Sequence, residues 1–243
     1  MKKFGLIGFP LEHSFSRKFF SEKFEKENID AVYNLYELEN INLFSKLVKN
    51  ENLYGLNVTI PYKEAIIPFL DKIDETAKKI GAVNVIKFDK NQNQLIGYNS
   101  DCVGFEKSLL PLLKSHHSKA LILGTGGASK AINYVLQKLN IETKFVSRTA
   151  NKNQLTYQDL TKEIMEQFTI IVNTTPLGMF PKIETFPPIP YIFLTSNHLL
   201  FDLVYNPKET AFLKYGLLHG CSIKNGYEML VEQALESWRI WNK

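Results

Sequence analysis

The sequence has few cysteines, no long apolar run and no long run of like charge. Its two cysteines, Cys102 and Cys221, lie far apart in the 243 residues and form no C-x-x-C pair, which argues against a disulfide framework and favours a reducing compartment. No segment approaches the roughly 18 consecutive apolar residues of a membrane span. Pro10 and Glu12 come before a signal-peptide core could form. We therefore expect a cytoplasmic protein without a membrane partner.

Missing charge and motif patterns exclude further classes of function. The 29 basic and 25 acidic residues leave a net charge of +4 without a long Lys/Arg run, so we expect no nucleic-acid partner, and an anionic small molecule explains the balance as well. The five histidines show no H-E-x-x-H or Cys/His spacing, which argues against a metal site. The absence of G-x-S-x-G argues against a serine hydrolase.

A glycine-rich turn is the first positive signal. The apolar run from Ala120 to Leu123 leads directly into Gly124-Thr125-Gly126-Gly127-Ala128-Ser129, and apolar residues at helical spacing follow. In a strand–turn–helix, such glycines let the backbone approach a pyrophosphate, which the N–H groups of the helix N-terminus then bind. Because position 129 is Ser, where the full fingerprint has a third glycine, an ordinary strand–helix turn remains the alternative.

The end of the next expected strand, residues 143–147, indicates which dinucleotide would bind. An NAD site carries an acidic residue there, about 20 residues after the glycines, to bind the ribose 2′-hydroxyl. This chain instead has Ser147-Arg148-Thr149, with Lys152 close behind. Two cations would attract a 2′-phosphate, which a carboxylate would repel. The segment therefore favours NADP.

Strands and helices alternate along the whole chain, which predicts an α/β fold. Apolar runs predict strands over residues 4–9, 31–36, 83–88, 95–98, 143–147, 169–173, 199–204 and 222–224. We expect a helix over residues 71–80 that ends at Gly81, and another that Asn206 caps and Pro207 opens. The polar segment 114–118 is a candidate domain boundary.

Polar residues at strand ends and helix starts are candidate ligand contacts, each with a structural alternative. Ser14 and Ser16 follow the first strand, where either is also a natural helix N-cap. Lys63 is expected in the first turn of a helix, where a cation is disfavoured unless it has a role or is exposed. Asn99-Ser100-Asp101 precedes a helix that it would cap. Gln233 lies among apolar positions of the last helix and therefore needs a polar partner.

Taken together, these segments resemble the shikimate dehydrogenase family, in the order in which that family carries them. The matched blocks are residues 10–16, Asn57-Val-Thr-Ile-Pro-Tyr-Lys63, Gly81-Ala-Val-Asn84, Asn99-Ser-Asp101, Gly124-Thr-Gly-Gly-Ala-Ser129, Ser147-Arg-Thr149, Asn173-Thr-Thr-Pro-Leu-Gly-Met179, Asp202-Leu-Val-Tyr-Asn-Pro207 and residues 226–234. The resemblance implies a substrate domain at 1–100, completed by a helix at 226–243. It also implies a Rossmann-like NADP domain with a parallel sheet at 101–225, and an active site in the cleft between the domains.

The resemblance also implies the activity and the residues that carry it. The reaction would be the reversible, NADPH-dependent reduction of 3-dehydroshikimate to shikimate, with Lys63 and Asp101 as the catalytic pair. Substrate would be bound by Ser14, Ser16, Thr59, Lys63, Asn84, Asp101, Tyr205 and Gln233. NADP would be bound by Gly124, Thr125, Gly126, Gly127, Ala128, Ser147, Arg148, Thr149, Lys152, Leu203 and Gly226. The partners would be small molecules, with the chain a monomer or a homodimer.

The chain departs from the family pattern at several positions, and other functions remain open. Ser100 stands where the family has Thr, Arg17 where Pro is usual, and Ser147 where Asn precedes the Arg-Thr pair. The chain is also somewhat short, and we expect the trimming within residues 151–168. The alternatives are an NAD-using quinate/shikimate dehydrogenase, a methylene-tetrahydrofolate dehydrogenase with a similar two-domain plan, and a cofactor-sensing regulator without activity.

Overall fold

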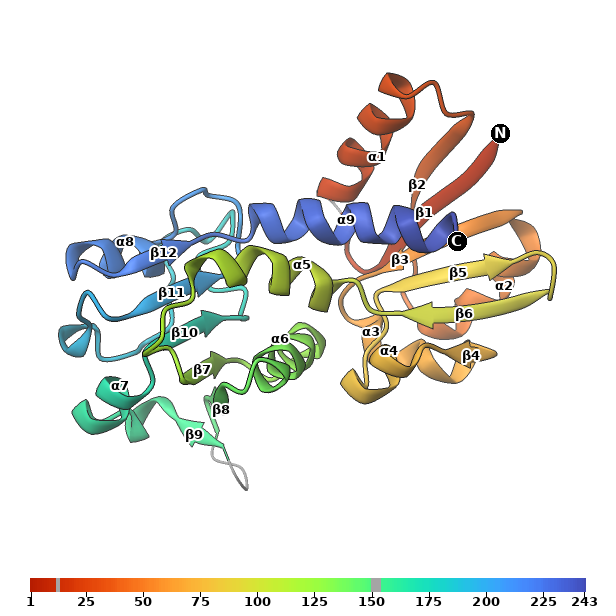
Figure 1. Cartoon of the computed structure of the whole chain (residues 1–243). Coiled ribbons are helices and arrows are strands. Elements are labelled where there is room, and N and C mark those ends of the chain that lie inside the picture. The colour runs from red at the N-terminus through yellow and green to blue at the C-terminus, as the bar shows by residue number, and fades with distance from the viewer. Residues whose placement is uncertain (12–13, 150–153) are drawn as a thin grey trace. The chain divides into compact units, whose positions relative to one another are not determined.

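The computed structural model describes residues 1–11, 14–149 and 154–243 and divides into two compact units. Unit 1 comprises Met1–Val103 together with Glu232–Lys243, and unit 2 comprises Gly104–Val231. The chain leaves unit 1 within helix α5 (Asp101–Leu109) and returns to it within helix α9 (Tyr227–Trp241) (Figure 1). Among the described residues, no helix has the length and hydrophobicity to cross a membrane.

Unit 1 is built on a six-stranded sheet of order β2-β1-β3-β5-β6-β4. Strands β1, β2 and β3 pair in parallel, whereas β5 and β6 form an antiparallel hairpin beside β3 (Figure 1). The elements of the unit before α5 are β1 (Lys2–Gly8), α1 (Phe15–Lys26), β2 (Ala31–Glu37), α2 (Phe44–Asn50), β3 (Leu53–Val58), α3 (Tyr62–Ala65), β4 (Lys72–Ile73), α4 (Glu75–Ile80), β5 (Val85–Asp89) and β6 (Gln94–Tyr98).

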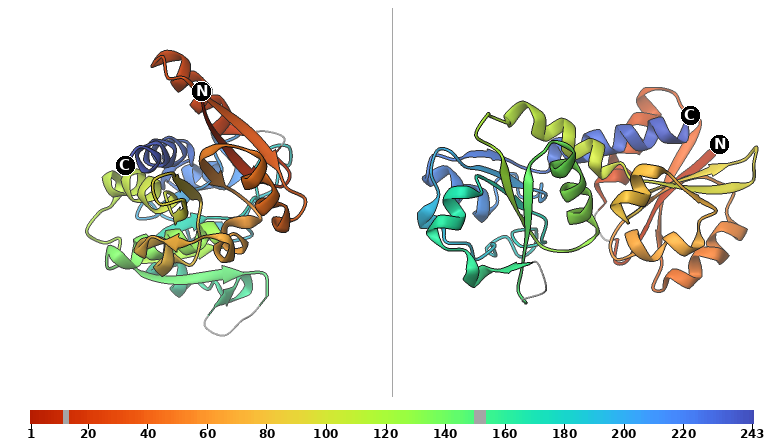
Figure 2. Two further views of the ribbon diagram at one scale, coloured as in Figure 1. Left: turned by 90° about the vertical axis from the view of Figure 1, so that its right-hand side faces the viewer. Right: turned by 60° about the horizontal axis from the view of Figure 1, so that its bottom comes forward.

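The C-terminal part of α9 completes the core of unit 1. The ring of Trp241 lies against Gly55 of β3, where an added Cβ would come 2.3 Å from the indole nitrogen. That nitrogen donates to the carbonyl of Ile86 at 3.0 Å. Trp241 and Ile240 thereby join the aromatic cluster around Phe4, and the right-hand view of Figure 2 shows the C-terminal end of α9 beside the strands of unit 1. A glycine at position 55 is therefore what lets the end of α9 reach the sheet.

Unit 2 is built on a fully parallel six-stranded sheet of order β12-β11-β10-β7-β8-β9. This is the doubly wound order of dinucleotide-binding sheets, and the strand order reverses between β7 and β10. A ligand of such a sheet binds beyond the carboxyl ends of these two strands. The elements are β7 (Lys119–Leu123), α6 (Gly127–Lys138), β8 (Glu142–Ser147), β9 (Leu155–Thr156), α7 (Lys162–Gln167), β10 (Ile170–Asn173), β11 (Leu199–Asp202), α8 (Ala211–Leu218) and β12 (Ser222–Lys224).

The predicted α/β fold with a parallel sheet is confirmed, but two predicted helix starts are wrong. Residues 71–73 are not helical, because Lys72 and Ile73 form β4, which pairs with β6, and Asp74 caps α4. Pro207 does not open a helix either. Helix α8 starts at Ala211 and is capped by Thr210, whose hydroxyl accepts from the third helical N–H.

Candidate active site

Lys63 is held by the backbone at the carboxyl end of β3. The N–H of Thr59 donates to the carbonyl of Ile7 at 2.9 Å, which ties the end of β3 to the end of β1. Helix α3 begins three residues later, and the carbonyl of Lys63 accepts from the N–H of Val83 at 2.7 Å. Because neighbouring segments fix it on both sides, the Lys63 side chain starts from a defined backbone position.

The side chain of Lys63 forms a buried ion pair with Asp101. Its Nζ lies 2.7 Å from Oδ2 of Asp101, and the two side chains are 15% and 2% exposed. A buried pair is stable only when the remaining polar atoms also have partners. Here Asn84 supplies one, because its Nδ2 donates to Oδ1 of Asp101 at 2.8 Å. The arrangement places a proton-carrying ammonium beside a carboxylate that is held at both oxygens.

Asn84 links this pair to the last helix of the chain. Its Oδ1 accepts from the backbone N–H of Ser100 at 2.6 Å, so the amide group turns its nitrogen toward Asp101. The same nitrogen lies 3.5 Å from Oε1 of Gln233 on α9. The structure thus brings together four residues predicted from the sequence: Lys63, Asn84, Asp101 and Gln233.

The other predicted substrate residues are placed differently. Ser14 caps α1, because its hydroxyl accepts from the N–H of Arg17 at 3.3 Å. This is the helix N-cap role expected from the sequence as the alternative to ligand binding. Ser16 lies in the first turn of α1, and Thr59 is partly exposed beyond β3. Tyr205 belongs to unit 2, where partial burial raises the pKa of its hydroxyl.

The glycine-rich turn lies at the reversal point of the unit 2 sheet. Gly124 has φ +106°, and an added Cβ would lie 2.8 Å from the hydroxyl of Thr174, beyond β10. Gly126 is the N-cap of α6 and has no side chain to bond the first helical N–H groups, and nothing lies within 4 Å of its Cβ position. Ser129 is buried and donates to the carbonyl of Gly126 at 2.6 Å. The turn therefore leaves the first N–H groups of α6 without a side-chain cap, which suits an anion.

The predicted phosphate-binding residues follow β8, beside this turn. The N–H of Gly124 donates to the carbonyl of Val146 at 2.9 Å, which joins the turn to the end of β8. Ser147 donates to the carbonyl of Thr149 at 2.5 Å, and Arg148 between them is exposed. Lys152 lies outside the described residues.

Leu203 and Gly226 meet at the carboxyl end of β11. The N–H of Leu203 donates to the carbonyl of Asn173 at 2.9 Å. An added Cβ at Gly226 would lie 2.1 Å from the carbonyl oxygen of Leu203, so only glycine fits there. The N–H of Gly226 also donates to the carbonyl of Val204 at 3.2 Å.

A buried polar cluster beneath this edge was not predicted as part of the site. Asp202 accepts from Nδ2 of Asn173 at 2.9 Å, from the hydroxyl of Thr210 at 2.6 Å and from the N–H of Val204 at 3.0 Å. Burial raises the pKa of Asp202 to about 6. Oδ1 of Asn173 accepts from the N–H of Thr175, so the cluster holds the segment against Gly124. In the sequence, this cluster is indicated by the polar residues Asn173 and Asp202, each of which ends an apolar strand.

A second unpredicted group lies in unit 1, where Asn57, Ser237 and Tyr33 extend the network of Asn84. Tyr33 donates to Oδ1 of Asn57 at 2.8 Å, and Asn57 donates to the hydroxyl of Ser237 at 2.9 Å. Ser237 lies four residues after Gln233, hence on the same face of α9. That spacing was the signal in the sequence. The described residues hold no group of three or more His, Cys, Asp or Glu side chains suited to a metal ion.

Comparisons with known proteins agree on one family. Residues 6–86 match the model of the shikimate dehydrogenase substrate binding domain. A shikimate dehydrogenase (NADP(+)) of Methanosphaera stadtmanae is 38% identical over 256 residues, which cover 98% of this chain and 90% of the relative. The structure of shikimate dehydrogenase from Aquifex aeolicus has a TM-score of 0.88 at 34% identity, over 100% of this chain and 92% of the other. That of the Thermus thermophilus enzyme, solved with NADP(H) and shikimate, has a TM-score of 0.87 at 27% identity, over 99% and 93%.

Proposed function

The chain belongs to the shikimate dehydrogenase family, and on that premise we propose that it catalyses the reversible, NADPH-dependent reduction of 3-dehydroshikimate to shikimate. The observation that carries the proposal is the buried pair of Lys63 and Asp101, held by Asn84. It lies in unit 1, which contains the residues that match the substrate-binding model. Unit 2 supplies a doubly wound sheet with a glycine turn at its reversal point.

Lys63 and Asp101 are proposed to handle the proton of the reaction. Reduction of a ring ketone needs a hydride, which NADPH supplies when bound, and a proton for the oxygen that becomes a hydroxyl. The Lys63 ammonium can give that proton or stabilise the developing alkoxide. Asp101 keeps the ammonium in place, and its carboxylate can accept a hydrogen bond from the substrate hydroxyl. In the oxidation direction the same two groups take the proton back.

The remaining substrate residues are proposed because their hydrogen-bonding groups match those of the substrate. Ser14 and Ser16 offer hydroxyl donors to the substrate carboxylate, and Asn84 and Gln233 offer amides to the ring hydroxyls. Thr59 lies at the carboxyl end of β3, four residues before Lys63. Tyr205, in unit 2, is proposed as a further substrate residue. Binding by several neutral donors suits a small polyhydroxylated acid, because each missing hydrogen bond would leave a polar group of the site unpaired.

The glycine turn and the end of β8 are proposed to hold NADP. The turn fits the cofactor, since the side-chain-free N-terminus of α6 faces open space at Gly126 and suits a pyrophosphate. Thr125, Gly127 and Ala128 would contribute backbone N–H groups. Ser147, Arg148, Thr149 and Lys152 would bind the adenosine end, with the two cations on the 2′-phosphate. Leu203 and Gly226 would border the nicotinamide end.

The domain roles follow from this assignment. We assign residues 1–100 and 226–243 to the substrate domain and residues 101–225 to the NADP domain. The two compact units divide inside α5 and α9, at Val103/Gly104 and Val231/Glu232, close to the proposed boundaries. A monomer or a homodimer is compatible with this function, since each chain carries every residue assigned to the site.

The test is nicotinamide absorbance with shikimate or quinate, crossed with NADP or NAD. The proposal expects rapid reduction of NADP with shikimate and a much lower kcat/KM for NAD. Preference for quinate with NAD would support the alternative dehydrogenase. Turnover of methylene-tetrahydrofolate with none of shikimate would support the folate enzyme. Tight NADPH binding without turnover of any of these substrates would support a regulator.

A further inference from the structure

Ser237 is a fully buried serine on α9 whose hydroxyl has three partners. It donates to the carbonyl of Gln233 at 2.8 Å, and it accepts from Nδ2 of Asn57 at 2.9 Å. The third partner is the hydroxyl of Ser100, 3.2 Å away. Because a hydroxyl has one proton and the proton of Ser237 is used on the carbonyl, Ser100 is the donor in this third bond. The Ser100 hydroxyl has a second acceptor in reach, Oδ1 of Asn84 at 3.4 Å, but that oxygen is farther away and already accepts from the Ser100 N–H, so we direct the Ser100 proton to α9.

The direction of the Ser100 O–H bond decides whether this hydroxyl donates a hydrogen bond to Asn84 or accepts one from it. With its proton directed to Ser237, its oxygen is left as an acceptor for Nδ2 of Asn84, 3.1 Å away. The backbone N–H of Ser100 meanwhile donates to Oδ1 of Asn84 at 2.6 Å. Both ends of the Asn84 amide are thus bonded to Ser100, and both bonds favour the same orientation. In the flipped amide an oxygen would face the hydroxyl oxygen and the carboxylate.

The orientation of Asn84 matters because its nitrogen is the second donor to Asp101. A flipped Asn84 would put an oxygen 2.8 Å from Oδ1 of Asp101, where two acceptors repel each other. The carboxylate would then move away, and with it the anchor of the Lys63 ammonium. A directed chain of hydrogen bonds therefore runs from Asn84 through Ser100 to Ser237 and ends on the backbone of α9.

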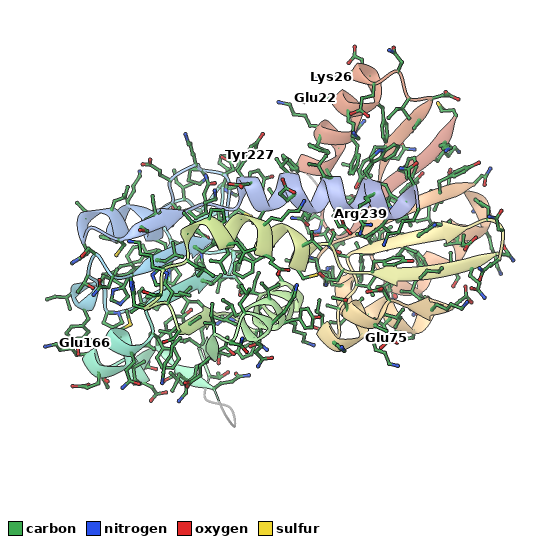
Figure 3. All side chains as sticks on the ribbon, viewed as in Figure 1. Glu22, Lys26, Glu75, Glu166, Tyr227 and Arg239 are labelled. Carbon is green, nitrogen blue, oxygen red and sulfur yellow. The ribbon has the colours of Figure 1, made fainter. Side chains whose placement is uncertain are left out.

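Helix α9, on which this series of hydrogen bonds ends, is held in place by contacts close to Ser237. One turn after Ser237, Trp241 is seated on Gly55 and bonded to the carbonyl of Ile86. Asn57 is held on its other side by the hydroxyl of Tyr33. The outer face of α9 is separate from this contact, since Arg239, labelled in Figure 3, is exposed and pairs with Glu236.

We propose that Ser237 is a positioning residue for catalysis, which acts through Ser100 to keep the Asn84 amide turned toward Asp101. The inference rests on the proposed function, because it assigns Asp101 to the reacting groups. It adds the hydroxyls of Ser237 and Ser100 to the residues on which the reaction depends. Neither touches the substrate in this assignment.

The test compares Ser237→Ala with a matched control, Ser108→Ala. Ser108 is also buried in a helix, and its hydroxyl donates to the carbonyl of Gly104, four residues earlier, as that of Ser237 does to Gln233. Loss of one orienting hydrogen bond should lower kcat of Ser237→Ala about three- to tenfold, with KM changed less than twofold. Ser108→Ala should keep kcat within twofold. Ser237→Thr, which keeps the hydroxyl, should restore most of the kcat.

A double variant separates positioning from general destabilisation. If Ser237 acts through Ser100, the Ser100→Ala/Ser237→Ala protein should have the kcat of Ser100→Ala alone. Independent effects would multiply, and they would overturn the proposal. So would a Ser237→Ala protein that loses thermal stability but keeps kcat within twofold of the wild type.

A measurement without turnover distinguishes this inference from the proposed function. The side-chain amide signals of Asn84 in a 15N-labelled protein, assigned by their loss in Asn84→Asp, should shift in Ser237→Ala and not in Ser108→Ala. If the wild type reduces no 3-dehydroshikimate but these signals shift, the proposed function is wrong, whereas the hydrogen-bond connection from Ser237 through Ser100 to Asn84 is supported. If the enzyme is active and the signals stay unchanged in Ser237→Ala, that connection is wrong.

Discussion

Replacing Asp202 by asparagine should change how the stability of unit 2 depends on pH. The Asp202 carboxylate is fully buried and accepts from two side chains and one backbone N–H. No lysine or arginine is paired with it in the part of the chain that the structure describes. Burial without a cation favours the protonated carboxyl, which is why the pKa of Asp202 is raised to about 6.

Proton linkage determines whether the stability contributed by Asp202 rises or falls with pH. The folded protein binds the proton more tightly than the unfolded chain, whose Asp pKa is 3.8. The stabilisation is therefore fully present below pH ~4 and is lost as the pH rises through about 6. A shift of about two pKa units corresponds to about 3 kcal/mol. The asparagine of the variant does not titrate, so the free energy of unfolding of the wild type, relative to that of Asp202→Asn, should fall by about 2 kcal/mol between about pH 4.5 and pH 7.5.

Thermal unfolding at constant ionic strength over this pH range is the assay. The matched control is Asp159→Asn in the same unit, because bonds from Thr156 lower the pKa of the exposed Asp159 carboxylate. For Asp159 the difference in stability between wild type and variant should stay nearly constant over this range, because a carboxylate with a lowered pKa loses its contribution only as the pH falls below about 4. A Tm difference between wild type and Asp202→Asn that stays constant across the range would refute the reasoning about burial.

Three further predictions concern the assigned sites and the contact of α9 with Gly55. Lys63→Ala should lower kcat by about 100- to 10,000-fold in the nicotinamide assay, and near-native kcat would contradict its assigned role. Arg148→Ala should lower kcat/KM for NADPH by about 10- to 100-fold through loss of charge-assisted bonds, while kcat/KM for NADH stays within about twofold; an equal loss for both cofactors would argue against phosphate recognition. Gly55→Ala should lower Tm and release Trp241 from its contact, seen as a red shift of tryptophan emission, and an unchanged spectrum would show that the indole had kept its place.

Periodic signals in the sequence predicted most of the fold correctly. The hairpin of β5 and β6 and the turn–helix after β7 follow from apolar runs bounded by turn residues. The two-residue strand β4 could not be predicted, because Lys72 and Ile73 carry no alternating pattern and owe their conformation to pairing with β6. The helix expected at Pro207 failed because Thr210, bonded to Asp202, caps the helix further on.

The residues assigned to the site were singled out one by one from the sequence, but the bonds between them were not predicted. Lys63, Asn84 and Asp101 were each singled out by type and position, yet nothing in the sequence says which oxygen of Asp101 each one contacts. Ser237 escaped notice because its spacing from Gln233 indicates only a shared helix face, whereas its contact with Ser100 joins residues 137 positions apart. Long-range polar contacts of this kind have no local pattern.

The divided make-up of unit 1 has a consequence for how the protein is made. The chain is synthesised from its N-terminus, and domains generally fold as they emerge. Residues 1–103 emerge first, but Gln233, Ser237 and Trp241 follow only after the whole of unit 2. Until they arrive, Gly55 and the aromatic cluster around Phe4 lack their cover, and Asn57 lacks its serine partner. The first unit to leave the ribosome is thus the last to be finished, and a nascent chain stalled inside α8 would expose that apolar surface to chaperones.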